Sequence, residues 1–240
     1  MPSTANAVVL AQSVSALDNR EIRAQLMPRQ YTTIAAEIGA KVRTIAFPEG
    51  ASFRRGATLV SFDCTLQQAQ VRKAEAALAA AEQTWRANQR LNELQSVGKL
   101  ELELSEAEVS KAKAELASNM AVISKCDISA PFSGRIAEQK IREQQYVQQG
   151  QTLLEILDDS ALEIEFIVPS KWMAWLKNGY RFQVFIDETG KRYPARVQRM
   201  AARVDPVSQS IKISASIDGH FPELIAGMSG QVNLTPPPGR

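Results

Sequence analysis

Residues 63–125 read DCTLQQAQVRKAEAALAAAEQTWRANQRLNELQSVGKLELELSEAEVSKAKAELASNMAVISK, and this stretch decides how the rest of the chain is organised. Its sequence predicts two helical limbs, because no proline interrupts it and Gly98 breaks the pattern near the middle, where the chain can reverse. Each limb of about 30 residues would be about 45 Å long. Apolar and small residues recur at alternating steps of three and four: Val71, Ala74, Leu78, Ala81 and Trp85, then Leu102, Ser105, Val109, Ala112, Leu116 and Ile123.

This predicted hairpin is too thin to be the core of a domain, because its seam is one residue wide and rich in alanine. An autonomous coiled coil that oligomerises through the segment would show the same periodicity. The sequence on either side of the hairpin must therefore distinguish an oligomerisation segment from an arm inserted into another domain.

The two sequences that flank the hairpin are related by a shift of 94 positions, which indicates an internal repeat of about 30 residues. Neither half has enough apolar residues to bury a core alone. We therefore expect the halves to pair into one small β-sandwich, with the hairpin projecting from its edge. The matching pairs are Ala36 and Ala130, Val42 and Ile136, Glu49 and Glu143, Phe53 and Val147, Gly56 and Gly150, Leu59 and Leu153, and Phe62 and Ile156.

Short strand candidates, separated by turn residues, fill both halves and the segment after them. Strands at the spacing seen after Asp158 indicate a small barrel. Ser170–Leu176 is predicted to be a short amphipathic helix with Ser170 as its N-cap. The strand candidates are 22–26, 42–47, 51–53, 58–62, 162–168, 181–187, 192–197, 210–217 and 230–234.

The two cysteines lie at the bases of the two limbs, Cys64 before the first and Cys126 after the second. In an antiparallel hairpin these positions face each other. In an oxidising compartment a disulfide there would close a loop of about 60 residues and stabilise the fold by roughly 4 kcal/mol. The alternative is two buried free thiols.

Composition favours an ordinary soluble globular protein, since 45% of the 240 residues are apolar, 22% are charged and the formal net charge is +2. No block of like charge indicates a nucleic-acid partner. With one histidine, no CxxC spacing, no phosphate-binding loop and no nucleophile motif, the sequence predicts no enzyme activity, no cofactor and no metal site.

No run of about 18 apolar residues occurs, so no transmembrane helix is predicted. The short apolar stretch Ala7–Ala11 lacks a basic flank and does not match a signal peptide. A native anchor or export signal is thus not visible in these 240 residues.

Three short motifs, in this order of parts, resemble the HlyD-like periplasmic adaptor or membrane fusion proteins of bacterial efflux and secretion systems. They are Glu49-Gly50 with Gly56, Leu59 and Asp63; Ile128-Ser129-Ala130-Pro131-Phe132-Ser133-Gly134-Arg135-Ile136 with Gly150, Leu153 and Ile156; and Leu224-Ile225-Ala226-Gly227-Met228-Ser229-Gly230. The resemblance implies a mainly β protein with a long α-helical hairpin, in which a split lipoyl/biotinyl-like β-sandwich is followed by a small β-barrel.

On this resemblance the chain is expected to divide into seven parts. These are an N-terminal tail (1–19), a strand joining the barrel (20–33), the first half of the lipoyl-like domain (34–63), the α-helical coiled-coil hairpin (64–126), the second lipoyl-like half (127–158), the β-barrel (159–235) and a C-terminal linker (236–240).

The resemblance also implies a function. An adaptor of this family bridges an inner-membrane transporter and an outer-membrane channel of the TolC type, lies in the periplasm at the inner membrane, and works as a ring of several copies. Both transporter classes, resistance-type and secretion-type, stay open. The alternatives are a lipoyl or biotinyl carrier, although no Met-Lys-Met or Asp-Lys-Ala sequence is found, and a structural coiled-coil oligomerisation protein.

The resemblance places partner binding at the tip of the hairpin: Arg90, Leu94, Gly98, Leu100 and Glu101. Family members commonly carry an Arg, a Leu four residues on and a Ser seven after that. Arg90 and Leu94 match this pattern, but Glu101 stands at the third position and the nearest serine is Ser105. Either the channel partner differs, or the hairpin docks with a shifted register. The alternative is that Arg90 is an ordinary solvated arginine and Leu94 a seam leucine.

Overall fold

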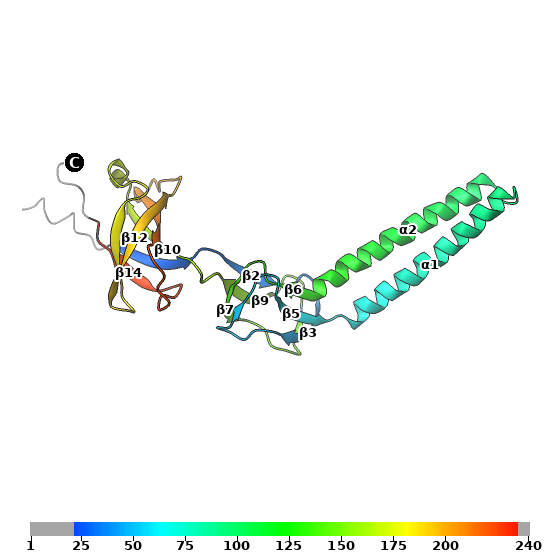
Figure 1. Cartoon of the computed structure of the whole chain (residues 1–240), viewed down its shortest axis with the longest axis horizontal. Coiled ribbons are helices and arrows are strands. Elements are labelled where there is room, and N and C mark those ends of the chain that lie inside the picture. Colours follow the sequence, from blue (N-terminus) through cyan, green and yellow to red (C-terminus); the bar gives the residue numbers. More distant parts are fainter. Residues whose placement is uncertain (1–21, 235–240) are drawn as a thin grey trace, which may run out of the picture. The chain divides into compact units, whose positions relative to one another are not determined.

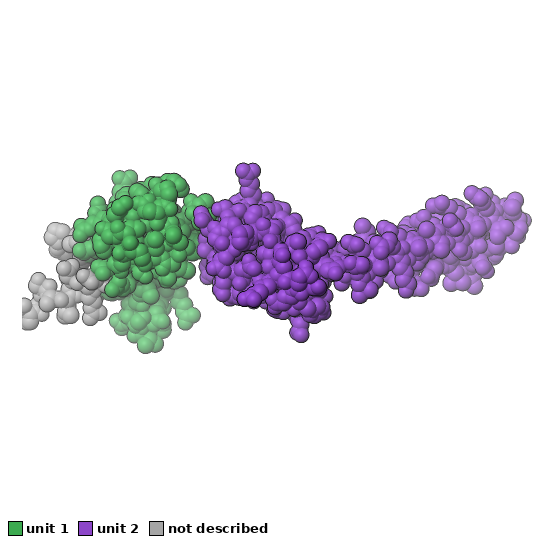
Figure 2. Space-filling model, turned by 90° about the horizontal axis from the view of Figure 1, so that it is seen from below, with its two compact units in different colours: residues 1–30, 158–240 green, residues 31–157 purple. Residues whose placement is uncertain are grey.

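The computed structural model describes residues 22–234, which form two compact units (Figures 1 and 2). One unit is Tyr31–Leu157, and the other combines the described residues up to Gln30 with those from Asp158 onward. The predicted N-terminal tail (1–19) and C-terminal linker (236–240) lie outside the described residues. Within residues 22–234, no helix is long and apolar enough to cross a membrane.

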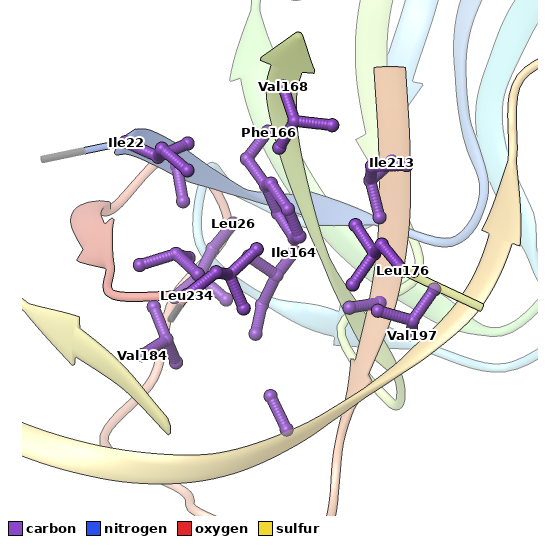
Figure 3. Close-up of a cluster of buried hydrophobic side chains, with 14 of the residues drawn as sticks. Ile22, Leu26, Ile164, Phe166, Val168, Leu176, Val184, Val197, Ile213 and Leu234 are labelled. Carbon is purple, nitrogen blue, oxygen red and sulfur yellow. The ribbon is translucent and has the colours of Figure 1, made fainter. Parts of the chain in front are cut away.

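The unit made of residues 22–30 and 158–234, the first unit, is a closed six-stranded antiparallel barrel, as predicted. Apolar side chains from every strand point into its interior, because residues alternate between the inside and the outside of a barrel. Figure 3 shows Leu26, Ile164 and Phe166 among the side chains that meet there. In order around the barrel the strands are β1 (Ile22–Pro28), β10 (Leu162–Pro169), β13 (Ser210–Ile217), β12 (Lys191–Met200), β11 (Arg181–Ile186) and β14 (Ser229–Val232).

Two glycines of the Leu224–Gly230 motif let the chain close this barrel. Gly227 has a φ of 93° and donates its N–H to the Leu26 carbonyl at 2.7 Å. A Cβ on Gly230 would lie 2.4 Å from the carbonyl oxygen of Phe185, so only glycine allows the backbones of β11 and β14 to pair here.

The prediction of a short helix at Ser170–Leu176 is confirmed in position, but its helix type and its cap are wrong. The segment is a short 3-10 helix, η2 (Ser170–Ala174), in which Ser170 is the first residue and makes no side-chain cap. Its N–H instead bonds the Gln209 carbonyl at 2.8 Å. Trp172 and Leu176 both pack in the barrel core, and the bond from the Trp175 N–H to the Trp172 carbonyl at 3.1 Å, three residues apart, gives the segment its tighter turn.

The second unit contains a sandwich of two four-stranded sheets. Each sheet mixes strands from before and after the hairpin, so the two halves of the repeat form one core. One sheet has the order β2 (Tyr31–Ala35), β9 (Thr152–Leu157), β7 (Gly134–Gln139) and β4 (Ser52–Phe53); the other has β6 (Asp127–Ser129), β5 (Thr58–Asp63), β3 (Ala40–Ile45) and β8 (Tyr146–Val147). Residues 31–33, expected with the barrel strand, begin β2 of the sandwich.

The predicted internal repeat is confirmed as a pseudo-twofold arrangement, because β3, β4 and β5 reappear 94 positions later as β7, β8 and β9. The backbone hydrogen bonds repeat with the strands. The N–H of Gly56 bonds the Ala130 carbonyl, and the N–H of Gly150 bonds the Ala36 carbonyl, both at 2.8 Å. Gly56 and Gly150 have φ values of 81° and 83°, which glycine adopts without strain.

The hairpin leaves this sandwich through α1 (Thr65–Glu93) and returns through α2 (Lys99–Ile123) and the short 3-10 helix η1 (Ser124–Cys126). Figure 1 shows α1 and α2 side by side and antiparallel. Cys64 and Cys126 form a disulfide at the root, with their Cα atoms 6.2 Å apart and both residues in the sandwich core. The predicted bridge is thus confirmed, and it ties the two ends of the insertion together.

We expect reduction of this disulfide to lower the free energy of unfolding of the sandwich unit by about 4 kcal/mol, because the bridge removes loop entropy from the unfolded chain over 62 residues of separation. Guanidinium denaturation of the oxidised and reduced wild type, followed by circular dichroism, measures the difference. The Cys64→Ala/Cys126→Ala variant is the control for the thiols themselves. Identical midpoints for the oxidised and reduced protein would contradict a stabilising role.

Candidate functional site: the helical hairpin and its tip

The seam between α1 and α2 follows the predicted pattern. Apart from Glu82, which pairs with Arg86, its members are the buried or half-buried residues of two otherwise exposed helices: Gln67, Val71, Ala74, Leu78, Ala81, Trp85 and Asn88 on α1, and Leu102, Ser105, Val109, Ala112, Leu116, Asn119 and Ile123 on α2. Each set advances by steps of three and four without a break, as in a coiled coil. The hairpin is therefore one continuous two-helix rod from root to tip.

The turn at the tip is a Schellman motif whose left-handed residue is Gln95, with a φ of 54°. The N–H of Ser96 bonds the Leu91 carbonyl at 2.8 Å, and the N–H of Gln95 bonds the Asn92 carbonyl at 2.9 Å. The prediction that Gly98 reverses the chain is wrong, because the helix ends at Glu93 and the residue two positions later must take the left-handed conformation.

Gly98 has a different place, as the N-cap of α2 with extended backbone angles of −73° and 151°. It offers no side chain to the free N–H groups of the first turn. Glu101 lies in that turn, where a carboxylate stabilises the positive end of the helix dipole. Lys99 and Glu103 form an exposed ion pair at 3.6 Å.

Exposed leucines surround this tip and form what we call the tip patch. Their exposed fractions are 41% for Leu91, 72% for Leu94, 69% for Leu100 and 61% for Leu104. Leu94 and Leu100 are among the residues predicted from the sequence, whereas Leu91 and Leu104 are not. Leu91 and Leu104 fall outside the heptad seam, and an apolar residue off the seam of an exposed helix was the signal that could have found them.

The other predicted residues lie at the same end. Arg90 is exposed in the last turn of α1, and no ion pair of Arg90 or Glu101 occurs among residues 22–234. Leu94 is the C-cap of α1 and not a seam residue. In that part of the chain, no group of three His, Cys, Asp or Glu side chains comes close enough to hold a metal ion.

Ser105 does not take the place of the serine that Glu101 replaces. It is 8% exposed, lies in the seam, and donates its hydroxyl to the Leu102 carbonyl at 2.8 Å. A shifted docking register that used Ser105 would need the two helices to separate. This leaves Glu101 itself as the polar group presented at that position.

At the root, Asp63 orients the start of α1. Its Oδ1 atom accepts hydrogen bonds from the Thr65 hydroxyl at 2.7 Å and the Thr65 N–H at 3.2 Å. The bond from the hydroxyl, followed by the bond from the N–H, lowers the pKa of the Asp63 carboxyl below its usual 3.8. The Lys125 ammonium pairs with Glu37 at 2.6 Å where the second limb returns.

Replacement Gln95→Gly should stabilise the tip by roughly 1 kcal/mol, because glycine adopts the left-handed conformation without the Cβ penalty. Amide hydrogen exchange of residues 88–105 measures the local opening. Gly98→Ala is the matched control, since Gly98 has an ordinary negative φ and open space around it, so Ala there relieves no left-handed strain. Faster exchange in Gln95→Gly would contradict the assignment.

Because the folded-state pKa of Asp63 is lowered, its contribution to stability is present above pH 3.8 and lost as the pH falls through the folded-state value. We therefore expect Asp63→Ala to lower the melting temperature at pH 7 and to differ less from wild type at about pH 2.5. A double-mutant cycle with Thr65→Ala isolates the pair. A difference that is the same at both pH values would contradict the role of the ionised carboxylate.

A relative in sequence and several solved structures are similar to this chain. No known family model matches the chain. A protein of Haemophilus influenzae described as uncharacterized is 24% identical over 214 residues, which cover 88% of this chain and 56% of that protein. The chain thus spans little more than half the length of this relative.

Solved structures agree much more closely in fold than in sequence. The membrane fusion protein Spr0693 from Streptococcus pneumoniae R6 matches with a TM-score of 0.74 and 14% identity, over 89% of this chain and 97% of that one. MacA from Actinobacillus actinomycetemcomitans matches with a TM-score of 0.71 and 20% identity, over 91% and 79%.

A MacA–MexA chimera that carries the α-hairpin domain of Pseudomonas aeruginosa MexA gives a TM-score of 0.76 at 19% identity, over 91% of this chain and 82% of the chimera. These matches each extend over about nine tenths of the chain. The chain therefore has the fold of the membrane fusion, or periplasmic adaptor, proteins.

Proposed function

We propose that this chain is a periplasmic adaptor subunit, which links an inner-membrane transporter to an outer-membrane channel of the TolC type in a bacterial efflux or secretion pump. It would act in the periplasm at the inner membrane, in a ring of several copies. The hairpin tip is the element that meets the channel. Arg90, Leu94, Gly98, Leu100 and Glu101 form the contact, together with Leu91 and Leu104.

The observation that carries this proposal is the tip patch, because four exposed leucines gather at the far end of a long two-helix rod. Single exposed apolar residues are normal on a surface, but a group of them at the end of an arm is typical of a binding site. Leu66, Met120 and Val122 are exposed near the root of the hairpin as well, but the tip patch is the group of four leucines at its free end.

The hairpin is also built to hold its tip at a fixed distance from the sandwich. Its seam is continuous, no proline or interior glycine interrupts α1 or α2, and the disulfide joins the two limbs at the root. A stiff arm reduces the conformational entropy that docking would otherwise cost.

Polar side chains beside the leucines determine which groups of a partner the tip can bind. Arg90 has a planar guanidinium free to bind the carbonyl groups that end a partner's helices. Glu101 presents a carboxylate where a serine is usual, so we propose that this channel offers a basic or N–H donor at that point. In a ring, several such weak contacts act together and give a stable assembly.

We expect Arg90→Asp/Leu94→Asp to reduce docking at least about tenfold, because it places charge in the patch and removes its cation. A photoreactive amino acid in place of Val97, at the tip, reports the contact by cross-linking to the channel in cells, and export is measured in parallel. Leu66→Asp/Arg72→Asp is the matched control, since both residues are exposed on the same helix near its root.

The control variant should cross-link and export as wild type does. Unchanged cross-linking and export in Arg90→Asp/Leu94→Asp would overturn the proposed contact. If the hairpin cross-links only to other copies of itself, the structural coiled-coil alternative would hold instead.

A further inference from the structure

The barrel has two chemically different ends. At one end the chain passes to and from the sandwich, where Pro28 pairs with Leu162. At the other end, which we call the distal end, β10 closes on β13 with Pro169 opposite Ser210. The distal end holds two connections, 170–180 and 201–209, together with the start of β1 at Ile22, which lies opposite Val232 at the end of β14. The Ser170 N–H joins the two connections by its bond to the Gln209 carbonyl.

Apolar side chains at this end face the solvent. Val207 is 93% exposed at the tip of the 201–209 turn, and Ile167, Met173 and Val204 are exposed around it. The turn is rigidly built: the Asp205 carboxylate accepts the N–H groups of Val207 and Ser208, both at 2.9 Å, and Asp205 bridges to Ser210. Val207 is therefore held outward by hydrogen bonds.

Charge is divided unevenly between the two ends. The distal connections carry Lys171, Lys177 and Arg203, and their one acid, Asp205, is occupied by the turn. None of these three bases has an ion pair among the described residues. The connections at the opposite end, 29–30, 158–161, 187–190 and 218–228, carry one base, Arg29, and six acids: Asp158, Asp159, Asp187, Glu188, Asp218 and Glu223. Three of these acids, Asp187, Asp218 and Glu223, pair with bases on the strands, so the acidic excess at this end is smaller than the count of acids.

An open hollow of about 1300 Å³ lies against β1, β10 and the end of the 201–209 connection. Hydrogen-bond donors line it, among them Arg23, Gln25 and Lys171, together with Ser208 and Ser210 of the distal turn. Lys212 lies there as well and pairs with Glu165 at 2.8 Å. Arg23 is also paired, with Asp187 at 2.8 Å, so Lys171 is the lining base without an ion pair among the described residues.

We propose that the distal end of the barrel rests on an anionic phospholipid surface, with Val204 and Val207 entering the headgroup layer. Lys171, Lys177 and Arg203 would contact the lipid phosphates, while the acidic opposite end is turned away. Separated aliphatic side chains flanked by long basic ones suit a fluid interface. The aromatic side chains of the 170–180 connection are held by the barrel, since Trp172 is buried in its core and Trp175 and Tyr180 pack half-buried against it, so the valines and the bases are the groups left to make the contact.

The full chain tests this proposal with vesicles of phosphatidylcholine alone or with 30% phosphatidylglycerol, by flotation. We expect clear binding only to the anionic vesicles, weakened by high salt. Lys171→Gln/Lys177→Gln/Arg203→Gln should lower the partition coefficient about fivefold for each charge removed. Val207→Asp should lower it further, because the inserted side chain becomes charged.

Matched controls separate this site from general electrostatics. Arg72→Gln/Lys73→Gln/Lys113→Gln removes the same charge from the hairpin, and Ile225→Asp alters an apolar residue, 63% exposed, at the acidic end. Both should bind as wild type does. In a Trp85→Phe background, which leaves only the barrel tryptophans, brominated lipid should quench fluorescence.

Equal binding to neutral and anionic vesicles, equal losses in the distal and hairpin triple variants, or binding that requires a membrane protein would each overturn the proposal. The inference is independent of docking at the tip. Arg90→Asp/Leu94→Asp should bind vesicles as wild type does, so failure of one proposal is distinguishable from failure of the other.

Discussion

Hydrogen bonds between two chain segments about 90 residues apart hold the second unit together. Gly50 donates its N–H to Ile136 at 2.9 Å, and Gln144, its counterpart in the second half, donates to Val42 at 2.9 Å. The side chains repeat the exchange, since Glu143 accepts the N–H of Ile45 and Glu49 accepts that of Gln139. Because every sheet needs strands from both halves, neither half can satisfy its backbone polar groups alone.

Because the two halves must pair with each other, the segment that joins them has to leave the sandwich and return to it. It is the connection between two halves that must return to each other, so its ends are fixed side by side by β5 and β6, which pair through Ser61 and Asp127. Pairing across so long a connection is entropically costly, and the disulfide at the root offsets part of that cost. A seam one residue wide can then form a stable arm, because the sandwich holds its base and the helices add their contacts from there.

The barrel has a separate hydrophobic core and does not depend on pairing between the two halves of the repeat. It joins a strand from the beginning of the described chain to five strands from its end, and full closure leaves no edge exposed. Its function therefore has to lie in its ends and outer face. The tip of the hairpin and the distal end of the barrel each combine exposed apolar residues with bases that have no ion pair among the described residues, and they belong to different units.

The sequence by itself determined the periodic features: the heptad seam, the strands, the repeat with its shift of 94 and the facing cysteines, because each depends on spacing along the chain. Only the tertiary structure decided which residue turns the tip, that Ser105 is buried, that Leu91 and Leu104 join Leu94, and that Ser170–Ala174 is a 3-10 helix whose Trp172 is buried in the barrel core. These depend on where a helix stops and which elements pack against it. The uneven charge of the two barrel ends could not be predicted from the sequence either. Connections rich in acids alternate along the chain with connections that carry bases, and antiparallel strands place successive connections at opposite ends of the barrel.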